Sequence, residues 1–219
     1  MSVHLSQMLD ELKARVARMS TLVYQCVETA VEAFVTADAK VAQQAIRQDD
    51  RIDAEEVVVE KSCIEVLGLQ QPAAADLRLV TTIIKVNSDF ERIADCGVNV
   101  AQRVLPLSQL PHYQPPKDLR LMANTVLATL HDTIKAFNLQ DQSQARLVLK
   151  SDDVVDALYH QIVQDMLTMM EADGQKATTD LNNIMIAKNL ERIADHCTNI
   201  AEDIIYIHTG RIIRHLHAV

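Results

Sequence analysis

Four pairs of acidic residues, each spaced by four positions, are the residues of this chain best suited to bind a ligand. On an α-helix this spacing places both carboxylates on one face, about one turn apart. Asn99 and Asn199 each follow a pair by one further turn. Oxygen ligands of this kind favour hard cations such as Mg²⁺ or Mn²⁺, and clustered carboxylates also hold Fe or Zn. The predicted metal ligands are therefore Asp49, Asp53, Glu91, Asp95, Asn99, Asp152, Asp156, Glu191, Asp195 and Asn199.

The acidic pairs belong to an internal duplication. The sequence Glu-Arg-Ile-Ala-Asp stands at residues 91–95 and again at residues 191–195, and Asp-Asp-x-x-Asp stands at 49–53 and at 152–156. The offset between the copies shrinks by about three residues from one motif to the next, so a small deletion separates them. Both acidic motifs thus occur twice and in the same order.

A single acidic pair on a helix is usually a solvated surface, so the recurrence carries the metal prediction. Four carboxylates within about 5 Å repel by roughly 3 kcal/mol per pair at an effective dielectric of 20, which requires a cation. Arg92 and Arg192 stand about 100° around the helix from the neighbouring Glu and are expected to point elsewhere. A divalent or trivalent metal ion fits better.

Other polar side chains near the pairs are assigned no ligand role. Glu56 and Glu60 extend the first pair, but Tyr159 and Val163 stand at their counterparts, so both acids are interpreted as surface or as a feature of the first copy alone. The histidines His160 and His196 have no partner at ligand spacing and are expected to be packed or exposed.

Composition predicts an all-α fold. Among 219 residues, 48% are hydrophobic and only 3% aromatic, with few Gly and Pro to interrupt helices. The net charge of −9 without a basic block disfavours nucleic-acid binding. Four isolated cysteines and the lack of an N-terminal signal sequence indicate a cytoplasmic protein with reduced thiols. Without an apolar stretch of about 20 residues, membrane contact is expected only through partners.

Proline and glycine predict the breaks between helices. Four of the five prolines fall in residues 105–116, which we interpret as a linker between a first repeat, 1–104, and a second repeat, 117–219. Gly68 and Gly174 predict a hairpin turn in each repeat. Each repeat should be a long antiparallel three-helix bundle, with the six helices near residues 4–37, 39–67, 72–104, 117–140, 142–172 and 176–214.

The chain resembles the PhoU family of phosphate-transport accessory proteins. The resemblance is strongest over residues 190–206, Leu-Glu-Arg-Ile-Ala-Asp-His-Cys-Thr-Asn-Ile-Ala-Glu-Asp-Ile-Ile-Tyr. It implies two tandem three-helix bundles and metal-binding acids at the eight paired positions, with Asn99 and Asn199 as neighbours. The first copy departs from the pattern at Cys96-Gly97-Val98, so the second repeat is expected to bind metal more firmly.

The resemblance also implies a function. Such a protein is a cytoplasmic negative regulator of the phosphate (Pho) regulon and of phosphate uptake, usually a homodimer. It acts as an adaptor between the ATPase subunit of the phosphate ABC importer and a phosphate-sensing histidine kinase, and it is no enzyme. The alternative from the residues is a carboxylate-bridged metalloenzyme on a helical bundle. Against it, no Asp or Glu has a His three residues later, as di-iron bundle enzymes require.

Overall fold

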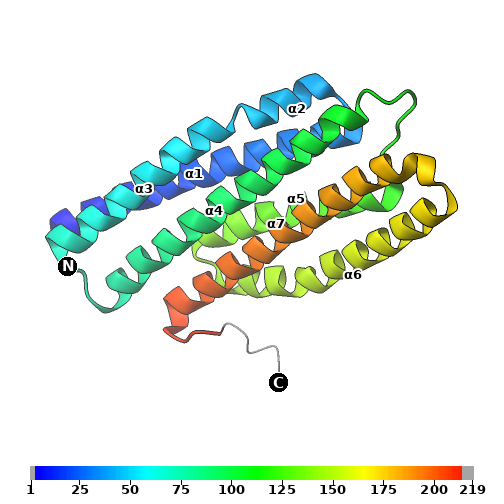
Figure 1. The fold of residues 1–219 in the computed structure, drawn as a ribbon. Coiled ribbons are helices and arrows are strands. Elements are labelled where there is room, and N and C mark those ends of the chain that lie inside the picture. Colours follow the sequence, from blue (N-terminus) through cyan, green and yellow to red (C-terminus); the bar gives the residue numbers. More distant parts are fainter. Residues whose placement is uncertain (1–2, 214–219) are drawn as a thin grey trace.

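The computed structural model describes residues 3–213, and these residues form helices and connecting turns without a strand (Figure 1). The first repeat contains α1 (Val3–Thr36), α2 (Ala39–Ile46), α3 (Asp49–Gln70) and α4 (Ala74–Leu107). The second contains α5 (Lys117–Leu139), α6 (Gln142–Ala172), the short 3₁₀ turn η1 (Gly174–Lys176) and α7 (Ala177–Thr209). The predicted all-α fold of two tandem antiparallel three-helix bundles is confirmed.

The prediction of one continuous helix over residues 39–67 is wrong. The chain forms two helices there, α2 and α3, which are separated at Arg47 and Gln48. At the break, the Gln48 N–H donates to the carbonyl of Ala45 and the Arg51 N–H donates to that of Gln48, so three-residue turns replace the four-residue helical ladder. Asp49 consequently lies in the first turn of α3, where the helix dipole favours a negative charge. In the second repeat, α6 runs through the same region without a break.

Helix ends are set by capping groups. Asp38 and Asp141, at matching positions, accept hydrogen bonds from the second and third N–H groups that follow them and begin α2 and α6. α3 continues through Gly68, where we predicted its end, and stops where Gln71 turns left-handed with φ 45°. α7 ends earlier than predicted, at Thr209, because Gly210 adopts φ 66°; residue 214 lies outside the described residues.

The predicted linker 105–116 begins too early. α4 continues through Pro106 to Leu107, where the Leu107 side chain is buried and the Ser108 N–H donates to the Val104 carbonyl at 2.8 Å. A proline in the last turn interrupts one backbone hydrogen bond at the end of a long helix, so the helix tolerates it there. Gly174, predicted as a turn, lies in η1 between α6 and α7.

The third helices of the two repeats, α4 and α7, pack against each other in the middle of the molecule (Figure 1). α4 also contacts α1, α2 and α3, whereas α7 contacts α5 and α6. The buried apolar side chains of both repeats form one continuous core. Phe90 and Phe137 meet edge to face across the repeats, with ring centroids 6.1 Å apart. No described helix is both long and apolar enough to cross a membrane.

Two helical glycines provide a test of this packing. A Cβ at Gly97 would stand 3.2 Å from Cγ2 of Val27 on α1, whereas a Cβ at Gly68 would meet open space. We expect Gly68→Ala to raise the free energy of unfolding by about 0.5–1 kcal/mol through helix propensity. Gly97→Ala should lower it by on the order of 1 kcal/mol, because overpacking outweighs the same gain. Equal stabilisation in urea unfolding would contradict close α1–α4 packing at Gly97.

Candidate metal sites

The first acidic cluster lies between α3 and α4. It consists of Asp49, Asp53 and Glu56 from α3 and Glu91 and Asp95 from α4. Burial raises the pKa of Asp49, and the charges of Asp53 and Asp95 raise it further. The pKa of Glu91 is likewise raised by burial, then by Asp95, and by Glu56 and Asp53 across the helix interface, against the opposing charge of Arg92. The acidic pairs of the two helices therefore face each other, as the sequence predicted.

The second acidic cluster repeats this arrangement between α6 and α7. It consists of Asp152 and Asp156 from α6 and of Glu191 and Asp195 from α7. Burial raises the pKa of Asp152 to about 6, with further contributions from Asp156, Asp195 and Glu191. Burial and Glu191 raise the pKa of Asp195, while Lys188 opposes the rise. Each repeat thus gathers four of the predicted acids at one helix–helix seam.

Glu56 belongs to the first cluster, although sequence reasoning placed it on the surface. Its side chain is half-buried, and its pKa is raised by burial and by Glu60, Asp53 and Asp95. The available signal was its position three residues after Asp53, which keeps both side chains on one helix face. It remains a feature of the first repeat alone, because Tyr159 occupies the matching position in α6.

Both clusters contact a cationic side chain of the chain itself, but from different positions. Arg92 places Nε 3.3 Å from Oε2 of Glu91 and Nη1 3.3 Å from Oδ2 of Asp95. Our expectation that Arg92 would point away is therefore wrong, since its long stem reaches around the helix to a residue three positions on. In the second repeat, Lys188 contacts both carboxylate oxygens of Glu191, at 2.9 and 2.7 Å.

Arg192 is exposed on α7. Burial raises the pKa of Cys96 on α4 to about 11, and the charges of Arg192 and Arg92 oppose that rise. The two duplicated arginines thus both act on Cys96, and Arg92 in addition contacts Glu91 and Asp95.

The two asparagines and two histidines considered in the sequence analysis lie one turn from the clusters or at helix interfaces and surfaces. Asn99 and Asn199 are half-buried one turn beyond Asp95 and Asp195, and their role as neighbours of the clusters stays a prediction. His196 is packed, as expected: its Nδ1 lies 2.9 Å from Oδ1 of Asp89 across the α4–α7 interface. The exposed His160 lies beside the ring of Tyr159.

The chemistry of the clusters suits a hard cation, whereas the side-chain positions do not yet form a ligand cage. The donors are carboxylate oxygens whose pKa values are raised first by burial and then by mutual repulsion, and each cluster contains more acids than cations. Within residues 3–213, however, no three Asp, Glu, His or Cys side chains already converge closely enough to hold a metal ion. A bound metal would require the carboxylates to rotate toward it. Metal occupancy therefore stays a prediction.

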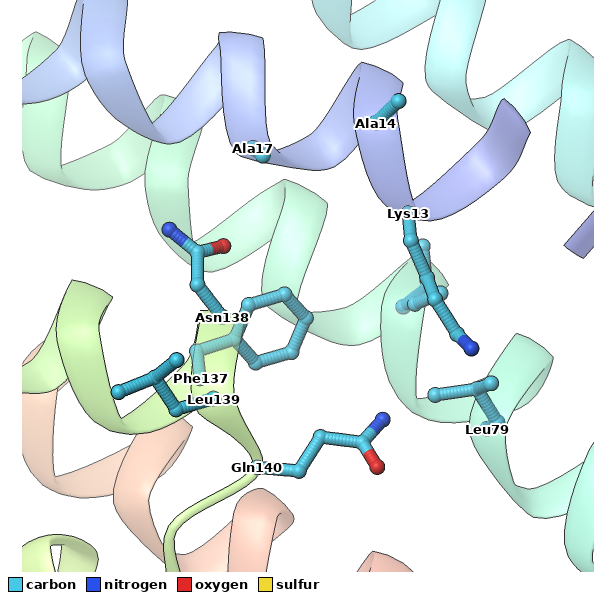
Figure 2. A pocket seen from close by; sticks show the side chains of 9 residues that line it. Lys13, Ala14, Ala17, Leu79, Phe137, Asn138, Leu139 and Gln140 are labelled. Atoms are coloured by element: carbon cyan, nitrogen blue, oxygen red, sulfur yellow. The ribbon is translucent and has the colours of Figure 1, made fainter. Parts of the chain in front are cut away.

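A separate hollow of about 450 Å³ lies between α1, α4 and the end of α5 (Figure 2). Apolar side chains such as Leu79 and Phe137 line it together with the amides Asn138 and Gln140. Lys13 is the one ionisable side chain among its lining residues. This lining holds no pair of groups that could act as nucleophile and base.

Replacing Asp152 tests the electrostatic strain of the second cluster. Its pKa is about 6 in the folded protein against an ordinary 3.8, so ionisation destabilises the fold as pH rises through this window. We expect Asp152→Asn to raise the Tm of metal-free protein by about 2–4 °C at about pH 7, and the gain to vanish toward about pH 4. The exposed Asp153→Asn on the same helix is the comparison and should give a smaller gain, because the Asp153 charge contributes less to the raised Asp152 pKa than burial does. Equal shifts for both variants would refute strain at Asp152.

Comparison with known proteins agrees with this fold. The PhoU domain model matches residues 16–104 and again 119–204. A PhoU homologue from Aquifex aeolicus, called a phosphate-specific transport system accessory protein, is 36% identical, and the match covers 95% of each chain. The crystal structure of PhoU from Pseudomonas aeruginosa superposes with a TM-score of 0.89 at 33% identity, covering 94% of this chain and 99% of that one. PhoU from Streptococcus pneumoniae gives 0.87 at 28% identity, covering 95% and 98%. The chain therefore belongs to the PhoU family.

Proposed function

We propose that this protein is an accessory regulator of phosphate transport. The observation that carries the proposal is the match along nearly the whole chain to relatives named phosphate-specific transport system accessory proteins, with both domain copies included. In this role the protein is a negative regulator of the Pho regulon and a modulator of phosphate uptake. It acts in the cytoplasm as a homodimeric adaptor between the ATPase subunit of the phosphate ABC importer and the phosphate-sensing histidine kinase.

The architecture supports an adaptor role. Packing of α4 on α7 joins the two bundles through one core, which favours a rigid body that can present long helix faces to protein partners. The outer helices carry exposed apolar side chains suited to protein contacts, namely Val57, Ile64 and Leu69 on α3 and Leu147, Val154 and Leu167 on α6. The net charge of −9 makes DNA an unfavourable partner. Contact with the membrane would be made only through the importer.

We further propose that the two acidic clusters hold divalent or trivalent metal ions such as Mg, Mn, Fe or Zn. Burial and, after it, mutual repulsion raise the pKa values of Asp49, Glu91, Asp152 and Asp195, and both costs of ionisation support a cation at each cluster. The metal serves stability or partner docking and does not support turnover, since the proposed ligands project from helices packed within bundles. A carboxylate-bridged metalloenzyme is the alternative.

Metal loading tests the clusters. We expect protein reloaded with Mn²⁺ to lose about half of its bound metal in Asp53→Ala/Asp95→Ala and again in Asp156→Ala/Asp195→Ala, because each double variant removes two carboxylates from one cluster. Elemental analysis after desalting measures the stoichiometry, and circular dichroism checks the fold. Unchanged metal content in both double variants would refute the ligand assignment. A redox or hydrolytic activity abolished by Asp195→Ala in folded protein would favour the metalloenzyme.

Deletion of the gene tests the regulatory role. We expect a reporter driven by a phosphate-starvation promoter to stay active in phosphate-rich medium when the protein is missing, and to be silenced when the wild-type gene is restored. If the reporter is as silent in the deletion strain as in the parent, the protein does not regulate these genes. Measuring phosphate uptake in the same strains separates a regulatory effect from a direct effect on transport rate.

A further inference from the structure

The cation that contacts the second acidic cluster has no counterpart in the first repeat. Lys188 lies three residues before Glu191 on α7, and its Nζ contacts both oxygens of that carboxylate, at 2.9 and 2.7 Å. The same Nζ lies 5.4 Å from the centre of the Tyr159 ring on α6. Lys188 therefore spans the seam between the two helices that supply the cluster.

The first repeat has different residues at the positions that match Lys188 and Tyr159. The position matching Lys188 is Ser88, which is exposed on α4, and the position matching Tyr159 is Glu56. Where the second repeat places a lysine over an aromatic ring, the first repeat therefore places a hydroxyl and a fifth carboxylate. The first cluster is more negative and carries no lysine.

Arg92 makes longer contacts with the acids of the first cluster than Lys188 makes with Glu191 of the second. Its two contacts, to Glu91 and Asp95, are both 3.3 Å long, and its side chain is 54% exposed. Lys188 makes shorter contacts, at 2.9 and 2.7 Å, although its side chain is 44% exposed. The acceptors Glu91 and Glu191 are similarly buried, at 18% and 14% exposed. Because strong charge-assisted hydrogen bonds between N–H groups and carboxylates are about 2.7–2.9 Å long, the longer Arg92 contacts oppose an incoming cation less than the Lys188 contacts do.

We propose that Lys188 is a built-in counter-cation that a metal ion must displace, so that the second cluster binds metal less tightly than the first. The inference rests on the proposed metal-binding function. It reverses the order expected from the sequence motif, in which the second repeat was the firmer site. Two cations cannot share the Glu191 carboxylate without mutual repulsion, and the ammonium group is tethered beside it at a fixed and high local concentration.

The consequence is a two-step loading of the protein. At low metal concentration the first cluster fills, while Lys188 neutralises the second. At higher concentration the metal replaces the ammonium group of Lys188 on Glu191. The two repeats thus respond over different ranges of metal concentration although their acidic motifs match.

The experiment measures Mn²⁺ binding by titration calorimetry at near-neutral pH on the full chain. Asp53→Ala/Asp95→Ala isolates the second cluster, and Asp156→Ala/Asp195→Ala isolates the first. In the first background, Lys188→Ser should tighten binding at least about tenfold, because it removes a positive charge that competes for the site. Lys188→Arg retains the charge and should not tighten binding. Lys135→Ser, on the exposed face of α5, controls for the change in net charge.

The reciprocal variant tests the same idea at a position that disturbs no buried contact. In the background that isolates the first cluster, Ser88→Lys introduces the missing lysine at an exposed site and should weaken Mn²⁺ binding at least about tenfold. Binding that is measurable but unchanged by both Lys188→Ser and Ser88→Lys would overturn the role of Lys188 and leave the metal function standing. Binding absent from wild type and every variant would overturn both.

Discussion

The packing of α4 against α7 determines where this chain can place charge. α4 is covered by the other helices of its own bundle and by α7, so that residues such as Cys96, Gly97 and Val98 are buried in succession. Some polar side chains of α4, such as Lys85, Ser88 and Arg92, are exposed, whereas others lie at its seams with neighbouring helices. Glu91 and Asp95 occupy the seam with α3, while Asp89 faces His196 on α7. The acids of α4 thus lie on either side of the core that joins the repeats.

Concentrating like charges at a seam costs stability, and each repeat offsets that cost with a different side chain. Arg92 contacts both acids of its own helix, and its charge and that of Arg192 both act on Cys96. Lys188 takes over the neutralising role in the second repeat. The backbone pattern and the acids were retained after duplication, while the cations diverged. Conserving the acids while changing their counter-charges is what makes the two clusters chemically unequal.

The parts of the fold that the sequence predicted are those controlled by local chemistry. The duplicated acids share one face of each helix because their spacing matches the helical period, and the hairpin turns fall close to where Gly68 and Gly174 interrupt the apolar pattern. The break between α2 and α3 was not predicted, because residues 46–49, Ile-Arg-Gln-Asp, contain neither Gly nor Pro. The left-handed Gln71 was missed for a different reason: Gly68 was the residue expected to end the helix, and it stays helical.

The side chains that complete the clusters were harder to predict, because the duplication directed attention to residues present in both copies. Glu56 and Lys188 each lie one helical turn from a duplicated acid, at three residues from Asp53 and Glu191, yet each occurs in one repeat only. A comparison of the two repeats that keeps only shared residues therefore overlooks Glu56 and Lys188. Their contacts also depend on a neighbouring helix, since Tyr159 approaches Lys188 from α6 and Asp95 acts on Glu56 from α4. That relation is tertiary and has no local sequence signature.

A tethered ammonium group and a free metal ion differ in one property that bears on regulation. The ammonium group is tethered beside the second cluster at every metal concentration, whereas the metal occupies the cluster only as its concentration allows. On the proposed function, loading the second cluster releases Lys188 from Glu191 and leaves its positive charge free at the α6–α7 seam. The protein fold needs no rearrangement for this exchange, because the helices are fixed by the core beneath them. The charge pattern that the second repeat presents to a partner then depends on metal, while the pattern of the first repeat is set at lower metal concentration.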